Sequence, residues 1–383
     1  MYEITNAVTV TKDITVRGST GKPEDVVIRM TGKDRCLWVN GGDNTIVHSL
    51  AVENGNRDMT FVYGSSIYIA GGDNPGGDPG RGYTPTAGNG IISNLVVRGG
   101  LNSCKFSVAP GIYACGEDAF VTHCVISNCH SSSGYIDGGY FSGLGLHLTG
   151  GARAENCLIT ENWSGSPYNG KSSDAMLTNG WYDANFHAAV FVGDKSVLRF
   201  STVVGNRASY CGGVNVADSG RVEACVIAGN TTLCNFLKNN HPASDRLSVW
   251  SAFPAMPSYC FYRGPSATEE LKAGCWTSFT NNVANEVRAA AAKASQFYAD
   301  AVDVADTGLG EDCLVATPEE LFLSPAAGDW RLRRLSPAVD VLPRRYAPNM
   351  SATDLIGNLR CCGGAFDLGC YELVTFGTLM IVR

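Results

Sequence analysis

The side chains best suited to chemistry lie in two long segments that interrupt a repeating pattern, residues 130–143 and 163–187. These segments mix aromatic rings with carboxylates, a lysine and a histidine, a composition that suits the walls of a polysaccharide groove. Long loops are usually functional or disordered, and the aromatic content argues against disorder here. The residues concerned are Tyr135, Asp137, Tyr140, Trp163, Tyr168, Lys171, Asp174, Trp181, Tyr182, Asp183 and His187. We expect Tyr140, Trp181 and Tyr182 to contact a substrate.

Two reaction types fit these side chains. A polysaccharide lyase needs a base that removes the proton beside a uronate carboxyl group, and a cation that stabilises the resulting charge. The candidates for the base are His147, Lys171, Tyr140 and Tyr182. A glycoside hydrolase needs two carboxylates at a suitable separation, and the candidates are Asp137, Asp174 and Asp183. For His147, a structural or orienting role is the alternative to catalysis.

A glycine-rich segment at residues 71–80 contains Asp73 and Asp78. Oxygen-rich loops of this kind can bind Ca²⁺, so these two carboxylates are candidate metal ligands. The segment lacks the full spacing of a calcium-binding motif, and an ordinary turn-rich loop is the alternative. Ca²⁺ is therefore the one cofactor that the sequence suggests.

The long segments interrupt an internal repeat of two short strands separated by a tight turn. The first strand occurs four times, as Gly111-Ile-Tyr-Ala-Cys115, Gly145-Leu-His-Leu-Thr149, Ala189-Val-Phe-Val-Gly193 and Gly213-Val-Asn-Val-Ala217. The second strand starts with Cys124, Cys157, Ser201 or Cys225, and five residues later comes Cys129, Asn162, Asn206 or Asn230. Two earlier repeats fit more loosely, at Leu37, Ser49 and Asn54 and at Ile67, Asn94 and Gly99. Constant strand spacing with loops of variable length is typical of a parallel β-solenoid.

Alternation within the first strand separates inward from outward side chains. The inward positions are apolar, beginning with Ile112. The outward position holds, from repeat to repeat, Trp38, Tyr68, Tyr113, His147, Phe191 and Asn215. Ring-bearing side chains are unusual on a solvated face, and we expect these six to bind sugar rings along an open groove beside the long loops. The alternatives are that folded-back loops bury the rings, or that they contact an apolar partner.

Stacked repeats place equivalent side chains about 4.8 Å apart, which predicts two ladders. One contains Cys124, Cys157, Ser201 and Cys225, and the other contains Asn54, Asn162, Asn206 and Asn230. We expect the ladder cysteines to be free and buried, because stacked strands do not by default provide disulfide geometry. The chain has 15 cysteines, an odd number, and no C-x-x-C pair.

This pattern resembles the right-handed parallel β-helix proteins of the pectate-lyase-like class. A second resemblance is C-terminal, where Ser336-Pro-Ala-Val-Asp340, Thr353-Asp-Leu-Ile-Gly-Asn-Leu-Arg360 and Asp367-Leu-Gly-Cys-Tyr-Glu372 look like the closing segment of many secreted bacterial β-helix proteins. The resemblance implies an all-β, right-handed parallel β-helix and does not specify a reaction. We interpret the charged residues of the closing segment as cap and turn residues: Asp354, Arg360, Asp367 and Glu372.

The sequence predicts one β-helix domain over residues 1–374, with repeats over 1–233 and a closing cap over 320–374. Residues 234–305 are expected to form an insertion that includes one helix, at residues 281–305, because of its alanine run. Residues 375–383 form a C-terminal tail. The chain starts without a signal peptide, and we expect that one has been removed from a secreted or cell-surface protein.

Composition excludes several classes of protein. Of the 383 residues, 29 are Lys or Arg and 36 are Asp or Glu, so the net charge of −7 argues against general nucleic-acid binding. No apolar run is long enough to span a membrane. We therefore expect an extracellular protein that binds and cleaves a polysaccharide by lyase or hydrolase chemistry. The alternative is a non-catalytic adhesin or surface-binding protein.

Overall fold

The computed structural model describes sixteen ranges of the chain, and they consist mostly of β-strand with very little helix. The fold of these residues is all-β. The described ranges are 1–57, 61–72, 86–102, 106–131, 141–164, 186–208, 211–216, 220–232, 234–235, 249–250, 259–261, 279–280, 283–284, 314–343, 351–360 and 365–374.

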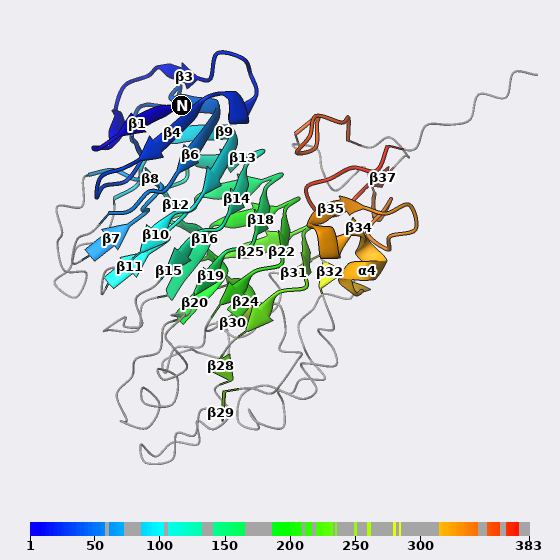
Figure 1. The fold of residues 1–383 in the computed structure, drawn as a ribbon. Coiled ribbons are helices and arrows are strands. Elements are labelled where there is room, and N and C mark those ends of the chain that lie inside the picture. Colours follow the sequence, from blue (N-terminus) through cyan, green and yellow to red (C-terminus); the bar gives the residue numbers. More distant parts are fainter. Residues whose placement is uncertain are drawn as a thin grey trace, which may run out of the picture.

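Each repeat contributes strands to three parallel sheets in turn. From β12 (Ile112–Cys115) in an eight-stranded sheet, the chain continues through β13 (Ala119–Thr122) and β14 (Val125–Ser127) in a sixteen-stranded sheet. It then forms β15 (His130–Ser131) in a five-stranded sheet and returns to the eight-stranded sheet as β16 (Phe141–Thr149), which pairs with β12. Figure 1 shows the successive strands following one another from the blue N-terminal end to the green ones.

The remaining strands repeat this path. The eight-stranded sheet also contains β2 (Val8–Val10), β5 (Leu37–Val39), β8 (Ile67–Ile69), β20 (Phe186–Val192), β24 (Cys211–Val216) and β30 (Tyr259–Phe261). The five-stranded sheet adds β10 (Leu101–Asn102), β19 (Trp163–Ser164), β23 (Arg207–Ala208) and β27 (Thr231–Thr232). The sixteen-stranded sheet adds β1 (Tyr2–Ile4), β3 (Thr15–Arg17), β4 (Val27–Met30), β6 (Ile46–Glu53), β9 (Gly90–Arg98), β17 (Arg153–Glu155), β18 (Leu158–Thr160), β21 (Val197–Arg199), β22 (Thr202–Val204), β25 (Arg221–Glu223), β26 (Val226–Ala228), β31 (Phe279–Thr280), β32 (Val283–Ala284) and β33 (Leu314–Val315).

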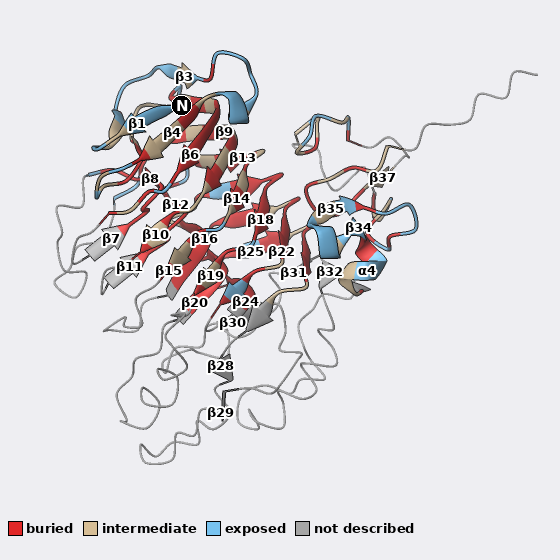
Figure 2. Ribbon diagram, in the orientation of Figure 1, coloured by how far each residue is buried: buried red, intermediate tan, exposed pale blue. Residues whose placement is uncertain are grey.

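The main core lies between these sheets. Ile112 pairs with Leu146, which pairs with Val190, and all three side chains are fully buried in one continuous hydrophobic cluster. The alternation predicted for the first strand is therefore confirmed. In Figure 2 the strands of the stack are mostly buried, whereas exposed residues gather at the N-terminal end and on the C-terminal segment.

The cysteine ladder is also confirmed. Cys124 and Cys157 precede the paired residues Val125 and Leu158, and Cys225 follows two strands later. Their thiols are free and buried, and burial raises the pKa of Cys225 to about 12. Each thiol donates to the carbonyl oxygen two residues earlier, at 3.2 Å in all three cases. Seven cysteines of the described ranges are buried and form no disulfide bond: Cys36, Cys115, Cys124, Cys129, Cys157, Cys225 and Cys370.

The asparagine ladder joins three repeats. The Asn162 Nδ2 atom donates to Oδ1 of Asn206 at 3.0 Å, and Nδ2 of Asn206 donates to Oδ1 of Asn230 at 2.9 Å. The same oxygens accept the backbone N–H of the preceding repeat, including that of Cys129. Asn54 is not a member, because its side chain is exposed and its positive φ of 59° matches the turn residue Gly99.

The alignment of the two earliest repeats was wrong by one residue. Leu50 and Leu95 pair with each other and occupy the place that Cys124 takes in the next repeat. Ser49 and Asn94 instead have a positive φ, at 58° and 52°, within the continuous strands β6 and β9. The equivalent residues of later repeats, from His123 onward, also have positive φ. There the left-handed residue lies between two consecutive strands, as His123 lies between β13 and β14.

Three short strands within the predicted insertion at residues 234–305 pair with strands of the repeats. Strand β30 pairs with β24, β31 pairs with β25, and β32 pairs with β26, all in parallel. Within the predicted helix at 281–305, Val283–Ala284 form β32 rather than helix, and residues 285–305 lie outside the described ranges. Strands β28 (Cys234–Asn235) and β29 (Val249–Trp250) form a separate antiparallel pair.

The C-terminal segment, described at residues 316–343, 351–360 and 365–374, packs against the side of the stack. It contains α4 (Pro318–Leu321), β34 (Phe322–Ser324), β35 (Asp329–Leu332), β36 (Leu342–Pro343), β37 (Ala365–Phe366) and a short 3₁₀ turn at Pro325–Ala327. Its Phe322, Leu332 and Leu368 share a second hydrophobic cluster with outward residues of the sixteen-stranded sheet, among them Leu158 and Val226. Figure 1 shows this segment, in orange and red, beside the green strands.

Three short elements complete the description. A 3₁₀ turn at Pro23–Asp25 precedes β4, and β7 (Phe61–Tyr63) pairs in parallel with β11 (Phe106–Val108). Within the described ranges, no helix has the length and apolar character needed to cross a membrane.

Candidate functional site

The predicted outward side chains of the eight-stranded sheet form a stacked column. We call Tyr68, Tyr113, His147 and Phe191 the ring column. Adjacent ring centroids lie 5.6, 5.0 and 4.4 Å apart in chain order, and adjacent ring planes differ by only 20–24°. The parallel register that was predicted is therefore present. Its consequence is that neighbouring rings cover each other's faces.

The ring column does not line an open groove. The exposed fractions of its four side chains are 0, 3, 6 and 8%. Tyr63 of β7 packs edge-on against Tyr113 at 5.0 Å, and Val108 and Ala109 belong to the same hydrophobic cluster outside the main core. Other segments of the chain therefore bury these rings. Burial of the rings is the alternative to an open groove that the sequence left open.

The two buried histidines of this region are neutral. Burial lowers the pKa of His147 to about 3 and that of His187 to about 4. The Nδ1 atom of His147 accepts the backbone N–H of Gly143 at 3.4 Å, which places its remaining proton on Nε2. A buried imidazole with so low a pKa does not suit a general base at neutral pH.

Planar groups continue the ring column at both ends. The guanidinium of Arg35, which is buried, lies 4.1 Å from the Tyr68 ring centre. Asn215 pairs with Phe191 and is fully buried, and its amide atoms have no hydrogen-bond partner in the described ranges. Trp38 pairs with Tyr68 and is partly exposed, and its indole N–H donates to the Ala70 carbonyl at 3.1 Å.

Most other predicted site residues lie outside the described ranges. Strands occupy both ends of the two long segments, at His130–Ser131 and Phe141–Thr149 and at Trp163–Ser164 and Phe186–Val192. The described residues contain no group of three or more histidine, cysteine or acidic side chains placed to hold a metal ion. The predicted residues that the structure does not describe are Asp73, Asp78, Tyr135, Asp137, Tyr140, Tyr168, Lys171, Asp174, Trp181, Tyr182 and Asp183.

A second row of outward side chains lies on the five-stranded sheet and is still accessible. The outer row consists of Leu101, His130, Trp163 and Arg207, which pair in parallel register. The first three are partly exposed and Arg207 is exposed. His130 and Trp163 stack with their ring centres 4.5 Å apart and their planes at 6°. Partial burial lowers the pKa of His130.

Sequence reasoning did not identify this row as part of a sheet. Trp163 was included among loop residues, because a strand of two residues carries almost no alternation signal. The available signal was positional: His130, Trp163 and Arg207 directly follow the ladder positions Cys129, Asn162 and Asn206. A residue that follows an inward residue in a strand points outward.

The polar side chains around the outer row differ in what they contact. Glu161, two residues before Trp163, accepts a hydrogen bond from Nδ2 of Asn128 at 3.2 Å, and both are exposed. Arg207 makes no ion pair and no ring contact with a described residue. The outer row therefore combines a stacked ring pair, one carboxylate and one available guanidinium.

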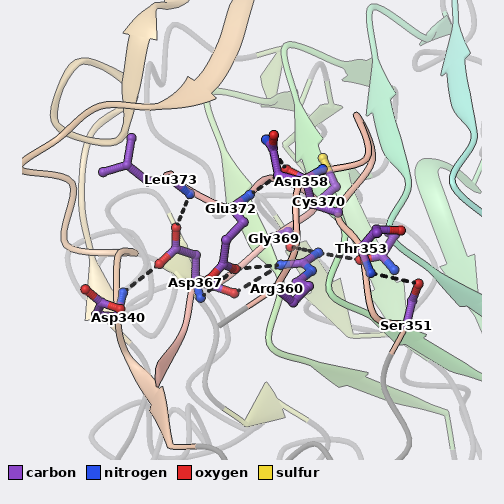
Figure 3. Close-up of polar contacts among 12 residues, drawn as sticks. Asp340, Ser351, Thr353, Asn358, Arg360, Asp367, Gly369, Cys370, Glu372 and Leu373 are labelled. Carbon is purple, nitrogen blue, oxygen red and sulfur yellow. Dashed lines mark hydrogen bonds and ion pairs between the residues drawn. The ribbon is translucent and has the colours of Figure 1, made fainter. Parts of the chain in front are cut away.

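The charged residues of the closing motif serve the C-terminal segment itself (Figure 3). The Arg360 guanidinium is buried, where it donates to the Gly369 carbonyl at 2.9 Å, bonds Oδ1 of Asn156 and pairs with Glu372 at 3.6 Å. The Asp354 carboxylate accepts the backbone N–H groups of Ile356, Asn358 and Glu372 at 2.7–3.0 Å. Asp367 accepts those of Asp340 and Leu373. These contacts support the interpretation as cap and turn residues.

Comparison with known proteins adds no assignment. No protein-family model matches the chain, and neither the curated proteins nor the solved structures contain a significant match.

Proposed function

We propose that this protein is an extracellular, right-handed parallel β-helix of the pectate-lyase-like class that binds a polysaccharide on the outer row. The repeated passage of the chain through three parallel sheets, with its two side-chain ladders, supports the β-helix. The closing motif, with its buried Arg360, supports the same class.

The stacked and partly exposed pair of His130 and Trp163 is the observation that supports binding. Aromatic rings that remain accessible contact the C–H surfaces of sugar rings, and each contact contributes about 1 kcal/mol beyond the area that it buries. His130 covers one face of the Trp163 indole, so a sugar contacts the opposite face or the ring edge. The row also continues along the stack, which suits a linear polymer.

Binding without cleavage is the form of the proposal that the described residues support best. His147 and His187 are neutral and buried. Beside the outer row, the described residues include the carboxylate of Glu161, which accepts a hydrogen bond from Asn128. A hydrolase needs two carboxylates, and a lyase needs an accessible base. The alternative is that the protein also cleaves the polysaccharide by lyase or hydrolase chemistry. Analysis of the reaction products distinguishes cleavage from binding alone.

The test measures the affinity of the protein for a panel of neutral and acidic polysaccharides by affinity electrophoresis. Trp163→Ala should weaken binding at least tenfold and leave the melting temperature nearly unchanged. The matched control is Phe120→Ala, because Phe120 is also a partly exposed ring, with Arg153 5.2 Å from its centre, but lies on the sixteen-stranded sheet. The control should bind like the wild type.

Product analysis runs on the same mixtures. An absorbance rise from unsaturated uronates would indicate a lyase, and new reducing ends without that rise would indicate a hydrolase. Unchanged affinity in Trp163→Ala, or an equal loss in Phe120→Ala, would contradict the outer row as the binding surface.

A further inference from the structure

Resting on the proposed function, we propose that the outer row selects sugars that carry an anionic group, a carboxylate or a sulfate, and that Arg207 binds that group. The inference concerns the chemical class of the ligand, which the stacked rings alone do not determine. It depends on the position of Arg207, on the absence of an ion pair between Arg207 and the described residues, and on the face of Trp163 opposite His130.

Arg207 lies on the strand next to Trp163. Strands β19 and β23 pair in parallel with Trp163 opposite Arg207, so the two side chains leave the sheet about 4.8 Å apart on the same face. Arg207 is exposed, whereas Trp163 is partly exposed. The guanidinium therefore reaches solvent beside the indole.

Four other arginines on the outer faces of the stack pair with carboxylates. Arg29 and Arg98 both pair with Glu53, at 2.7 and 2.5 Å. Arg199 pairs with Glu155 at 2.7 Å, and Arg221 lies 3.4 Å from Glu223.

Arg207 differs from these arginines. It has neither an ion pair nor a ring contact with the described residues, although Glu161 is on the adjacent repeat. A guanidinium that no described carboxylate pairs with is available to an external anion.

The ring pair leaves one side of the indole for a ligand. His130 stacks on the face of Trp163 that points toward the preceding repeat, at 4.5 Å. The other face points toward the repeat of Arg207. A sugar ring against that face would place an equatorial carboxylate or sulfate within reach of the guanidinium, whose fork-shaped donors suit bidentate contact with such groups.

Glu161 and the negative net charge of the chain restrict the attraction of anionic sugars to the surroundings of Arg207. Glu161 carries a negative charge on the repeat of Trp163, and Asn128 holds its side chain at 3.2 Å. The chain as a whole carries −7. Non-specific attraction of polyanions is therefore disfavoured, and an anionic sugar is oriented with its charge toward Arg207 and its hydroxyl groups toward Glu161.

The experiment compares polymers that share a backbone and differ in charge. Dextran is paired with carboxymethyl-dextran and dextran sulfate, and hydroxyethyl-cellulose is paired with carboxymethyl-cellulose. The folded wild-type protein should bind the charged member of a pair at least tenfold more tightly, and added NaCl should reduce this preference. The two charged dextrans distinguish carboxylate from sulfate as the preferred group.

Three variants test the assignment to Arg207. Arg207→Gln should abolish the preference for the charged polymer and keep residual binding through Trp163, and Arg207→Lys should restore part of the preference. Arg153→Gln is the matched control, because Arg153 is also exposed and lies beside an aromatic ring on the other sheet. It should keep the wild-type preference.

The outcomes separate the two proposals. Equal affinity of the wild type for charged and neutral polymers, or a preference that survives in Arg207→Gln, overturns the role of Arg207 and leaves polysaccharide binding in place. Failure of the wild type to bind any polymer overturns both proposals.

Discussion

At the scale of single residues, stacking in register decides what the ring column can do. Tyr113 lies between Tyr68 and His147, and Tyr63 contacts its edge. A ring whose two faces and edge contact other rings has no face left for a sugar. The same 4.8 Å spacing that suggested a sugar-binding groove therefore gives the ring column a structural role.

The first prediction is that Tyr113→Ala destabilises the protein by about 3–5 kcal/mol, as expected for removal of a buried aromatic ring. Chemical denaturation monitored by circular dichroism measures this change. Polysaccharide affinity of the folded variant should equal that of the wild type. Tyr2→Ala is the control, because Tyr2 is 63% exposed and should not change stability. Weaker binding with unchanged stability would mean that the ring column is the binding surface after all.

The second prediction concerns acid. His147 has a pKa of about 3 when folded and near 6.5 when unfolded, so the unfolded chain binds more protons between these values. Stability is therefore complete above pH 6.5 and declines as the pH falls below it, by on the order of 2 kcal/mol at pH 4.5 for this residue. His147→Phe keeps an aromatic ring between Tyr113 and Phe191 and removes that contribution.

Denaturation curves of both proteins at pH 7 and pH 4.5 measure the difference. The wild type should lose more stability on acidification than His147→Phe. Some pH dependence should remain in the variant, because burial also lowers the pKa of His187, to about 4. An identical decline in the two proteins would show that His147 becomes protonated without cost in the folded state.

At the scale of elements, the turns between strands fix the register in which strands of successive repeats pair. The side chain of Asn206 joins three repeats: its Oδ1 accepts from Asn162, and its Nδ2 donates to Asn230 and to the Ile159 carbonyl. The preceding turn residue, Gly205, has a φ of 68°, which places the next residue inward. Ladder and left-handed turn together fix where each strand begins.

The third prediction is that Asn206→Ala lowers the free energy of unfolding by about 3 kcal/mol, because it leaves several buried polar groups without partners. Denaturant titration measures the loss, and hydrogen exchange should show weaker protection in the repeats on both sides. Asn6→Ala, at an exposed position near the N-terminus, is the control and should match the wild type. A loss of stability in Asn206→Ala no larger than in the control would mean that the ladder does not contribute.

At the scale of the whole molecule, the C-terminal segment joins repeats that otherwise contact only their neighbours. His123 donates through Nε2 to the Thr353 carbonyl at 3.1 Å, and Arg360 bonds the side chain of Asn156. The backbone N–H of Gly369 reaches the Ala224 carbonyl at 2.9 Å. These contacts span several repeats of the sixteen-stranded sheet, so we expect them to unfold together.

The fourth prediction is that Arg360→Ala destabilises the protein by about 3 kcal/mol, because Glu372 is left as a buried charge without its guanidinium partner. Limited proteolysis should then cut the C-terminal segment first, and hydrogen exchange in β18, β22 and β26 should increase. Arg331→Ala is the control, because its pair with Asp329 is exposed and should contribute little. Equal proteolysis of the two variants would argue against a joining role for this segment.

The sequence alone determined the features that depend on strand period and on equivalent positions in neighbouring repeats. The apolar positions that begin at Ile112, the cysteine ladder and most of the asparagine ladder follow from alternation, because a strand must present every second side chain to the same side. The same argument was off by one residue at Ser49 and Asn94, since the less regular repeats gave no second landmark to fix the alignment.

Only the tertiary structure decided which outward side chains remain accessible. Alternation states the side of the sheet that a residue faces, but not what covers that side. Tyr63 of β7 and Val108 of β11 pack in one cluster with Tyr68 and Tyr113 of the ring column, and the C-terminal segment covers Leu158 and Val226. His130 and Trp163 stay partly exposed, because burial depends on packing between segments that no local pattern in the sequence records.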